Sequence, residues 1–183
     1  MKKCGINIIY NLKCGRINQK MEEEVMNGYL SFVLHAHLPY VRHPEYEEFL
    51  EEDWLYEAIT ETYIPLLEMF ENLTRDNIPW NLTITMSGTL VNMLNDDLLR
   101  NRYVKHITKL VEFCEKEVER LEPYPDMIKV ANHNLHVHKT AKDIFVNKYH
   151  KDLVGAFRGF QDQGNLEIIP VTATHGFLPV MKD

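Results

Sequence analysis

Residues 29–40 read Tyr-Leu-Ser-Phe-Val-Leu-His-Ala-His-Leu-Pro-Tyr, an apolar run that leads directly into two histidines and a proline. The nearly continuous apolar pattern of Tyr29–Leu34 is typical of a strand buried on both faces of a parallel sheet. Strand side chains alternate between the two faces, so His35 and His37 are expected on one side. Pro39 has no amide proton to donate and ends the strand. The stretch therefore predicts two imidazoles at the C-terminal end of a strand, where α/β folds place their ligand sites.

Two later stretches resemble further strands, and helical patterns separate them. Trp80–Met86 alternates between apolar and hydroxyl side chains and predicts a second strand, and Leu166–Val171 predicts a third. This alternation predicts an α/β fold of about three parallel strands with crossover helices, either an incomplete barrel or the start of a doubly wound sheet. The chain stops soon after the third strand, so we interpret it as a fragment with an open sheet edge. The helices are expected at residues 54–74 with a kink or a break after Ile64 at Pro65, 90–100 after a turn capped by Thr89, 102–121, and 140–163 with Gly164 as the C-cap.

Residues 1–27 differ from the rest of the chain because they show no sustained hydrophobic period. We expect the domain to cover residues 28–183 and the first 27 residues to form a poorly ordered extension. A second interpretation is that Met26 is the true start and that the upstream residues come from an over-extended gene. The N-terminal peptide, identified by mass spectrometry, distinguishes the two interpretations.

The composition limits the class of partner and the compartment. A formal net charge of -7 over 183 residues argues against nucleic acid or an anionic membrane as a partner. No stretch has the length and apolarity of a membrane span. The chain has three cysteines, an odd number, and none of them forms a Cys-x-x-Cys motif. They are Cys4, Cys14 and Cys114. We therefore expect a protein of the reducing cytoplasm with no disulfide framework.

Polar side chains follow each predicted strand and should meet at one rim of the sheet. The rim set comprises His35, His37, Ser87, Thr89, Thr172, Thr174 and His175. Three histidines could form a zinc site of a hydrolase or deacetylase, with a carboxylate from the acidic loop 41–53. They could instead hydrogen-bond to sugar hydroxyls beside an aromatic ring. A third possibility is that one imidazole is merely buried and another solvated. The pattern alone leaves these readings open, while the carboxylates of loop 41–53 and the histidines of 132–138 are expected to be solvated.

Three blocks of sequence closely resemble glycoside hydrolase family 57, in particular its branching-enzyme and α-amylase-like branch. The first block is 28–42, Gly-Tyr-Leu-Ser-Phe-Val-Leu-His-Ala-His-Leu-Pro-Tyr-Val-Arg. The second is 54–67, Trp-Leu-Tyr-Glu-Ala-Ile-Thr-Glu-Thr-Tyr-Ile-Pro-Leu-Leu. The third combines 164–169, Gly-Asn-Leu-Glu-Ile-Ile, with 173–179, Ala-Thr-His-Gly-Phe-Leu-Pro. Pro170-Val171-Thr172 departs mildly from the family pattern, and residues 1–27 have no counterpart.

The resemblance implies the N-terminal portion of a (β/α)7 incomplete TIM-like barrel that performs retaining chemistry on α-1,4-glucans without a metal or other cofactor. It places His35 and His37 in the donor sugar subsite, Trp54 near the cleft, and His175 beside the catalytic centre as a supporting residue. The family's glutamate nucleophile and aspartate acid/base would both lie beyond Asp183. The chain alone is thus expected to hold no catalytic carboxylate, and Glu167 is expected to be structural.

The implied partners are an α-glucan, such as amylose or glycogen, and a separate chain that carries the missing C-terminal part. Branching, hydrolysis and transfer of an oligosaccharide remain equally compatible with these blocks. Two alternatives stand beside this interpretation. One is the zinc-dependent hydrolase or deacetylase described above, and the other is a non-catalytic glucan-binding remnant.

Overall fold

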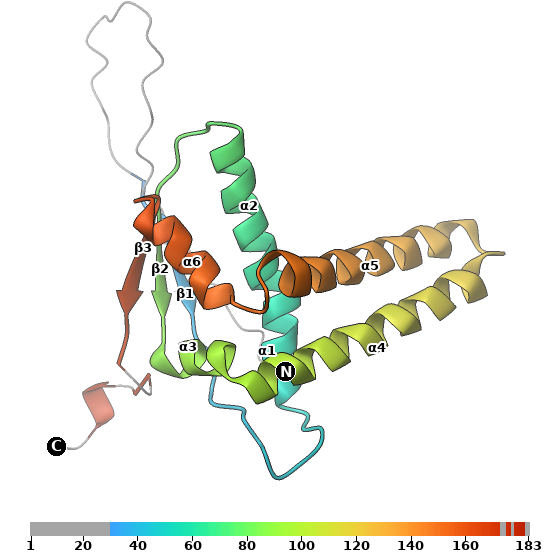
Figure 1. Ribbon diagram of the computed structural model, residues 1–183, viewed down its shortest axis with the longest axis horizontal. Helices are drawn as coiled ribbons and strands as arrows, with labels where there is room; N and C mark the ends of the chain where they lie inside the picture. Colours follow the sequence, from blue (N-terminus) through green and yellow to red (C-terminus); the bar gives the residue numbers. More distant parts are fainter. Residues whose placement is uncertain (1–29, 173–174, 177, 182–183) are drawn as a thin grey trace, which may run out of the picture.

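A computed structural model describes residues 30–172, 175–176 and 178–181 of the chain. Its centre is a parallel sheet in the order β1-β2-β3, which confirms the predicted three-stranded parallel arrangement. In Figure 1 the three strands run in the same direction, and the helices gather on one side of them. The strands are β1 (Val33–Ala36), β2 (Leu82–Met86) and β3 (Leu166–Pro170).

The two faces of the sheet differ in burial. Ala36, Ile84 and Leu166 are buried and belong to the core cluster that contains the helices. On the opposite face, His35 and Glu167 are exposed. The prediction of a first strand at 29–34 buried on both faces is therefore wrong. The strand begins later, at Val33, and includes His35. In the described part of the chain, only one of its faces packs against helices. Residue 29 lies outside the described residues.

The first crossover is one continuous helical segment with a widened turn in its middle. The amide of Ile64 donates to the carbonyl of Ile59, which lies five residues earlier. Pro65 follows at the start of α2 and has no amide proton to donate, so the regular ladder cannot pass through it. The segment widens just before Pro65 and does not break after Ile64, so the predicted break is wrong. The segment consists of α1 (Glu52–Ala58), η1 (Ile59–Tyr63) and α2 (Ile64–Arg75).

The second crossover contains a long helical hairpin that extends away from the sheet in Figure 1. The chain breaks at Asp96, whose backbone is extended and whose side chain caps the amide of Leu99 at 3.0 Å. The helix boundary predicted near residue 101 is therefore wrong, since a capping aspartate sets it five residues earlier. Within the described residues, no helix is long and apolar enough to cross a membrane. This crossover begins with α3 (Gly88–Asn95), α4 (Asp97–Leu121) and α5 (Pro125–Asp143).

Residues 132–138, whose histidines are expected in a solvated loop, belong to helix α5. Pro125 lies in its first turn, where a missing amide proton costs nothing, so the proline starts this helix. The single helix predicted at 140–163 is also wrong, because His150 and Lys151 have positive φ angles of 50° and 67° that interrupt it. Gly164, with φ 81°, ends the last helix as predicted. The remaining elements are η2 (Ile144–Lys148), α6 (Leu153–Asp162) and, after β3, η3 (Leu178–Val180).

Aromatic rings join the helices to one another and to the sheet. Phe70 of α2 is fully buried and stacks on Trp80, just before β2, with ring centroids 4.5 Å apart. Its other neighbour is Phe160 of α6, at 5.4 Å. Deeper in the helical layer, the Tyr103 hydroxyl and Thr60 are 2.9 Å apart, and burial raises the pKa of Tyr103 to about 12. The core thus lies between the helices and one face of the sheet.

Replacement of Phe70 by alanine should lower the free energy of unfolding by about 3–5 kcal/mol, because a buried ring is lost and a cavity remains. Phe113→Ala is the matched control, since that ring is 59% exposed on α4 and its loss should change stability by less than about 0.5 kcal/mol. Urea unfolding followed by circular dichroism measures both variants. Equal losses would contradict the placement of Phe70 at the centre of the core.

Candidate histidine site

Three imidazoles meet at the C-terminal ends of the strands. His35 lies in β1, His37 follows it by two residues, and His175 arrives from the segment after β3. The ring centroid of His175 is 4.8 Å from that of His35 and 4.1 Å from that of His37. The Nε2 atoms of His175 and His35 are 2.7 Å apart. The structure therefore brings together the three histidines that the sequence singled out.

Hydroxyl groups of the neighbouring strand hold the first two histidines. The Nδ1 atom of His35 is 2.6 Å from the Thr85 hydroxyl, and that of His37 is 2.8 Å from the Ser87 hydroxyl. His35 and Thr85 are register partners in the parallel ladder. His37 and Ser87 each follow these partners by two residues. Both contacts thus follow from the register. Thr85 is not among the predicted site residues, although Thr85-x-Ser87, at and just after the end of β2, repeats the spacing of His-x-His.

The proton on His37 can be assigned from its neighbours. Thr89 donates its proton to the Leu38 carbonyl at 3.3 Å, so the Ser87 hydroxyl must be the donor in the 3.0 Å contact between these two residues. Ser87 also accepts from the amide of Leu90 at 3.3 Å. With its proton committed, Ser87 can only accept from His37. The Nδ1 atom of His37 therefore carries the proton, and in the neutral ring Nε2 is an acceptor.

Ser87 also serves as the N-cap of α3. Its backbone is extended and its side chain accepts from the third following amide, as N-caps do. The predicted cap, Thr89, lies inside the helix and instead ties the chain to the backbone after β1. The fully buried Ser87 thus links the helix start to the histidine row, which we define as His35, His37 and His175.

Two imidazoles of the histidine row, those of His35 and His37, resist protonation. Burial lowers the pKa of His35 and of His37, and the nearby His175 lowers both further. A φ of 53° turns the backbone at His175, whose amide donates to the Thr172 carbonyl at 2.8 Å. Since one ring nitrogen must donate to the other, His35 and His175 share a single proton between their Nε2 atoms. His37 therefore offers an uncharged acceptor nitrogen, which suits a hydroxyl group.

The other predicted site residues lie in different surroundings. Thr172 is exposed just after β3, and Thr174 lies outside the described residues. Trp54 is in the first turn of α1, and 49% of its surface is exposed. Glu167 lies near the start of β3, where it accepts from the Thr83 hydroxyl at 2.8 Å, away from the strand ends. In the described part of the chain, no three His, Cys, Asp or Glu side chains are grouped as a metal site.

One carboxylate of the acidic loop is buried, which contradicts the expectation that all of them are solvated. Glu52 has only 1% of its surface exposed; it pairs with Arg102 of α4 and accepts from the Tyr56 hydroxyl at 2.8 Å. Arg102 also donates to the carbonyls of His43, at 3.1 Å, and Tyr46. Burial and the Glu52 carboxylate raise the pKa of Tyr56. This pair thus fixes the loop that leaves the histidine row.

A second ion pair fixes the start of the same loop. Arg42 donates to Asp96 at 2.7 Å, and Asp96 also caps α4. Partial burial raises the pKa of Asp96, but the Leu99 amide and Arg42 outweigh it and leave that pKa below its usual value. The amide of Val41 lies 3.3 Å from the sulfur of Met93 in α3. Loop 41–51 is therefore bound to both α3 and α4.

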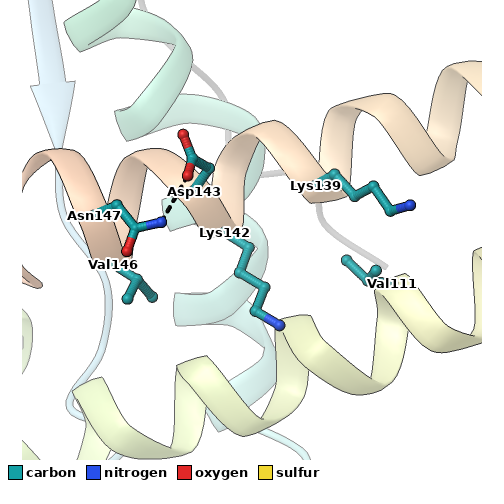
Figure 2. Close-up of a pocket in the computed structure, with 6 residues that line it drawn as sticks. All are labelled: Val111, Lys139, Lys142, Asp143, Val146 and Asn147. Atoms are coloured by element: carbon teal, nitrogen blue, oxygen red, sulfur yellow. Dashed lines mark hydrogen bonds between the residues drawn. The ribbon is translucent and has the colours of Figure 1, made fainter.

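Two hollows of the described surface lie away from the histidine row. Figure 2 shows one between α4 and the segment from α5 to η2, where Asn147 donates to Asp143 at 2.7 Å. Its Lys139 is paired with Glu115 at 2.7 Å. Another hollow lies at the opposite ends of the strands, beside Trp80 and Asn165. Neither of these two hollows is lined by a residue of the histidine row.

Comparisons with known proteins point to one family. Residues 31–183 match the model of glycosyl hydrolase family 57. The chain is 35% identical over 156 residues to a 1,4-alpha-glucan branching enzyme of Thermococcus kodakarensis, with 85% of this chain and 22% of that protein covered. It is 24% identical over 167 residues to a probable 1,4-alpha-glucan branching enzyme of Mycobacterium tuberculosis, with 84% and 31% covered. The chain therefore spans less than a third of the length of these relatives.

Solved structures agree with these matches. The alpha-amylase AmyC of Thermotoga maritima has a TM-score of 0.76 and 43% identity, with 81% of this chain and 28% of that chain covered. A GH57-type branching enzyme of Pyrococcus horikoshii has a TM-score of 0.76 and 31% identity, with 82% and 28% covered. These likenesses confirm the predicted fold, a portion of the (β/α)7 barrel.

Arg102→Met should lower the free energy of unfolding by about 3–5 kcal/mol, because it leaves the Glu52 carboxylate buried without its cation. Arg120→Met on the same helix is the control, since its pair with Glu117 lies at the surface and should contribute no more than about 1 kcal/mol. Urea unfolding at neutral pH compares the two. A loss no larger than that of the control would disprove the structural role of this pair.

Titration followed by NMR should give His35 and His37 pKa values below the ordinary 6.5. His175→Ala should raise both, but not completely, because burial is the larger cause; His136→Ala on α5 should change neither. Between 6.5 and the lowered values, the unfolded chain binds more protons than the folded one. Stability should therefore fall as the pH drops through this window. A pKa above 6.5 for either histidine would contradict this account.

Proposed function

Because the chain belongs to glycosyl hydrolase family 57, we propose that its three strands contribute one wall of a cleft that binds and processes α-glucans. The observation that supports this most strongly is the histidine row fixed by Thr85 and Ser87 at the strand ends. Such a row suits recognition of sugar hydroxyls by rigid, neutral donors and acceptors. In this proposal the protein serves cytoplasmic glycogen or starch metabolism, as a transferase or a hydrolase.

The chemistry of the row favours a neutral, hydroxyl-rich ligand. The pKa values of His35 and His37 are lowered, so these two imidazoles present little positive charge to an anionic substrate at neutral pH. The chain's net charge of -7 points the same way. The acceptor Nε2 of His37 would take a hydrogen bond from one sugar hydroxyl. Trp54 would add an apolar ring for the face of a neighbouring sugar.

In this proposal His35 and His37 bind the donor sugar, and His175 supports the catalytic centre. None of them replaces the two carboxylates that a retaining glycoside hydrolase uses as nucleophile and acid/base. Glu52 is committed to Arg102, and Glu167 is bonded to Thr83 near the start of its strand. The family resemblance implies that both catalytic carboxylates lie on later strands, beyond Asp183, and we keep that assignment in this proposal.

The partner that would supply these strands is a polypeptide carrying the rest of the barrel. The open face and the β3 edge of the sheet are suited to receive it, since Ile169 of β3 is 39% exposed there. The relatives include branching enzymes and an alpha-amylase, so branching, hydrolysis and glucan transfer are all within the proposal. Cys114, a free buried thiol, is compatible with a reducing cytoplasm.

The test combines the chain with the missing part of the barrel. The purified chain alone should leave the iodine stain of amylose unchanged. Addition of a polypeptide encoded immediately downstream, or of the remainder of the Thermotoga maritima protein, should restore activity that His37→Ala lowers at least tenfold. His136→Ala, on the hairpin, is the control and should not lower it. Activity of the chain alone, or activity unaffected by His37→Ala, would refute the proposal.

A further inference from the structure

Loop 41–51 and its flanks carry an unusual share of exposed aromatic surface. Four large apolar side chains within residues 40–54 are about half exposed or more. Figure 1 shows the loop leaving the C-terminal end of β1, the end that carries the histidine row. This exposed aromatic surface follows His35 and His37 directly along the chain. Exposed apolar surface beside a binding site can extend that site. The four side chains are Tyr40, Tyr46, Leu50 and Trp54.

Three rings of this loop pack on one another and form what we term the ring stack. Phe49 lies 3.8 Å from His43 between ring centroids, and 5.0 Å from Tyr46 at an interplanar angle of 22°. Even so, 52% of Tyr46 remains exposed. Since Phe49 covers one of its faces, the exposure of Tyr46 comes largely from its edge and its other face. The stack thus presents the ring of Tyr46 to a ligand, with Phe49 packed against its other face.

The backbone beneath the ring stack is held by buried charge. Arg102 donates to the carbonyls of His43 and Tyr46, the two residues whose rings flank Phe49. Glu52, almost fully buried, pairs with the same guanidinium. The amide of Glu52 in turn donates to the Phe49 carbonyl at 3.0 Å. An exposed ring fixed in this way loses little conformational freedom on binding, which is the property of a preorganised contact.

The charges around the ring stack select the kind of ligand. Glu45 lies within 3.3 Å of His43, and Glu47 is exposed beside Tyr46. Glu48 pairs with Lys109. Carboxylates around a ring face disfavour anions such as nucleic acid or phosphate, and they can accept hydrogen bonds from sugar hydroxyls. A pyranose, with an apolar face and a rim of hydroxyls, fits this combination of ring and acceptors.

We propose that the ring stack of Tyr46, Phe49 and His43 is a second α-glucan contact, which binds glucose units farther along a chain held by the histidine row. The inference rests on the proposed function and extends it, because it makes this loop determine the length of glucan that the protein prefers. Tyr46 is the residue that touches the sugar. Arg102 and Glu52 are positioning residues.

The test is NMR titration of the chain with maltoheptaose, following His35 and His37 for the row and Tyr46 and Phe49 for the stack. Wild type should show shifts at both places. Tyr46→Ala should weaken binding roughly three- to tenfold, the order expected for loss of one aromatic contact, while Tyr46→Phe should retain it. Tyr124→Ala is the matched control, because Tyr124 is 55% exposed at the start of the distant α5 and should have no effect.

The outcomes separate this inference from the proposed function. One outcome is that the signals of His35 and His37 shift, those of Tyr46 and Phe49 do not, and Tyr46→Ala binds maltoheptaose as tightly as wild type. This outcome would overturn the ring-stack contact and leave the proposed function intact. Shifts in the loop without shifts at the histidines would overturn the histidine row as the glucan site, and with it the ring stack as an extension of that row. An absence of shifts at both places would overturn the two together.

Discussion

The register of β1 against β2 is the constraint on which the rest of the site depends. With His35 opposite Thr85, the alternation of side chains places Ala36 and Met86 in the helical core and the imidazoles on the open face. A slip by one residue would exchange the two sets and bury the histidines against apolar helices. The same alignment brings His37 to Ser87, which begins α3. Core packing and site geometry are therefore fixed by one ladder.

Two ion pairs, Glu52–Arg102 and Arg42–Asp96, fix the conformation of loop 41–51, which follows β1. The Glu52–Arg102 pair is costly to desolvate, and packed apolar residues could stabilise the helices as well. What apolar residues could not do is donate hydrogen bonds to the loop carbonyls, which Arg102 does at His43 and Tyr46. Burial of this pair therefore makes sense as a means to fix loop geometry beside the histidine row, with any gain in stability secondary.

The sequence was most informative where the pattern is short and local. His-x-His after an apolar run located two of the three clustered imidazoles, and Pro65 marked the widened turn. It was least informative where distant contacts decide. Nothing near Glu52 distinguishes it from the other acidic residues of its loop, because its partner lies 50 positions away. Helix α5 was missed because polar His and Asn residues cover much of it and only Ala131 and Ala141 are buried along its length.

Stability and chemistry are divided between the two faces of the sheet. The helix side holds the rings of Phe70 and Phe160, and the open side holds polar groups whose hydrogen bonds run along the strand ends. Ser87 belongs to both, since it caps a helix and sets the tautomer of His37. A substitution there would change helix stability and the hydrogen-bonding character of the site together. The histidine row can therefore vary little without a matching change in the helix that supports it.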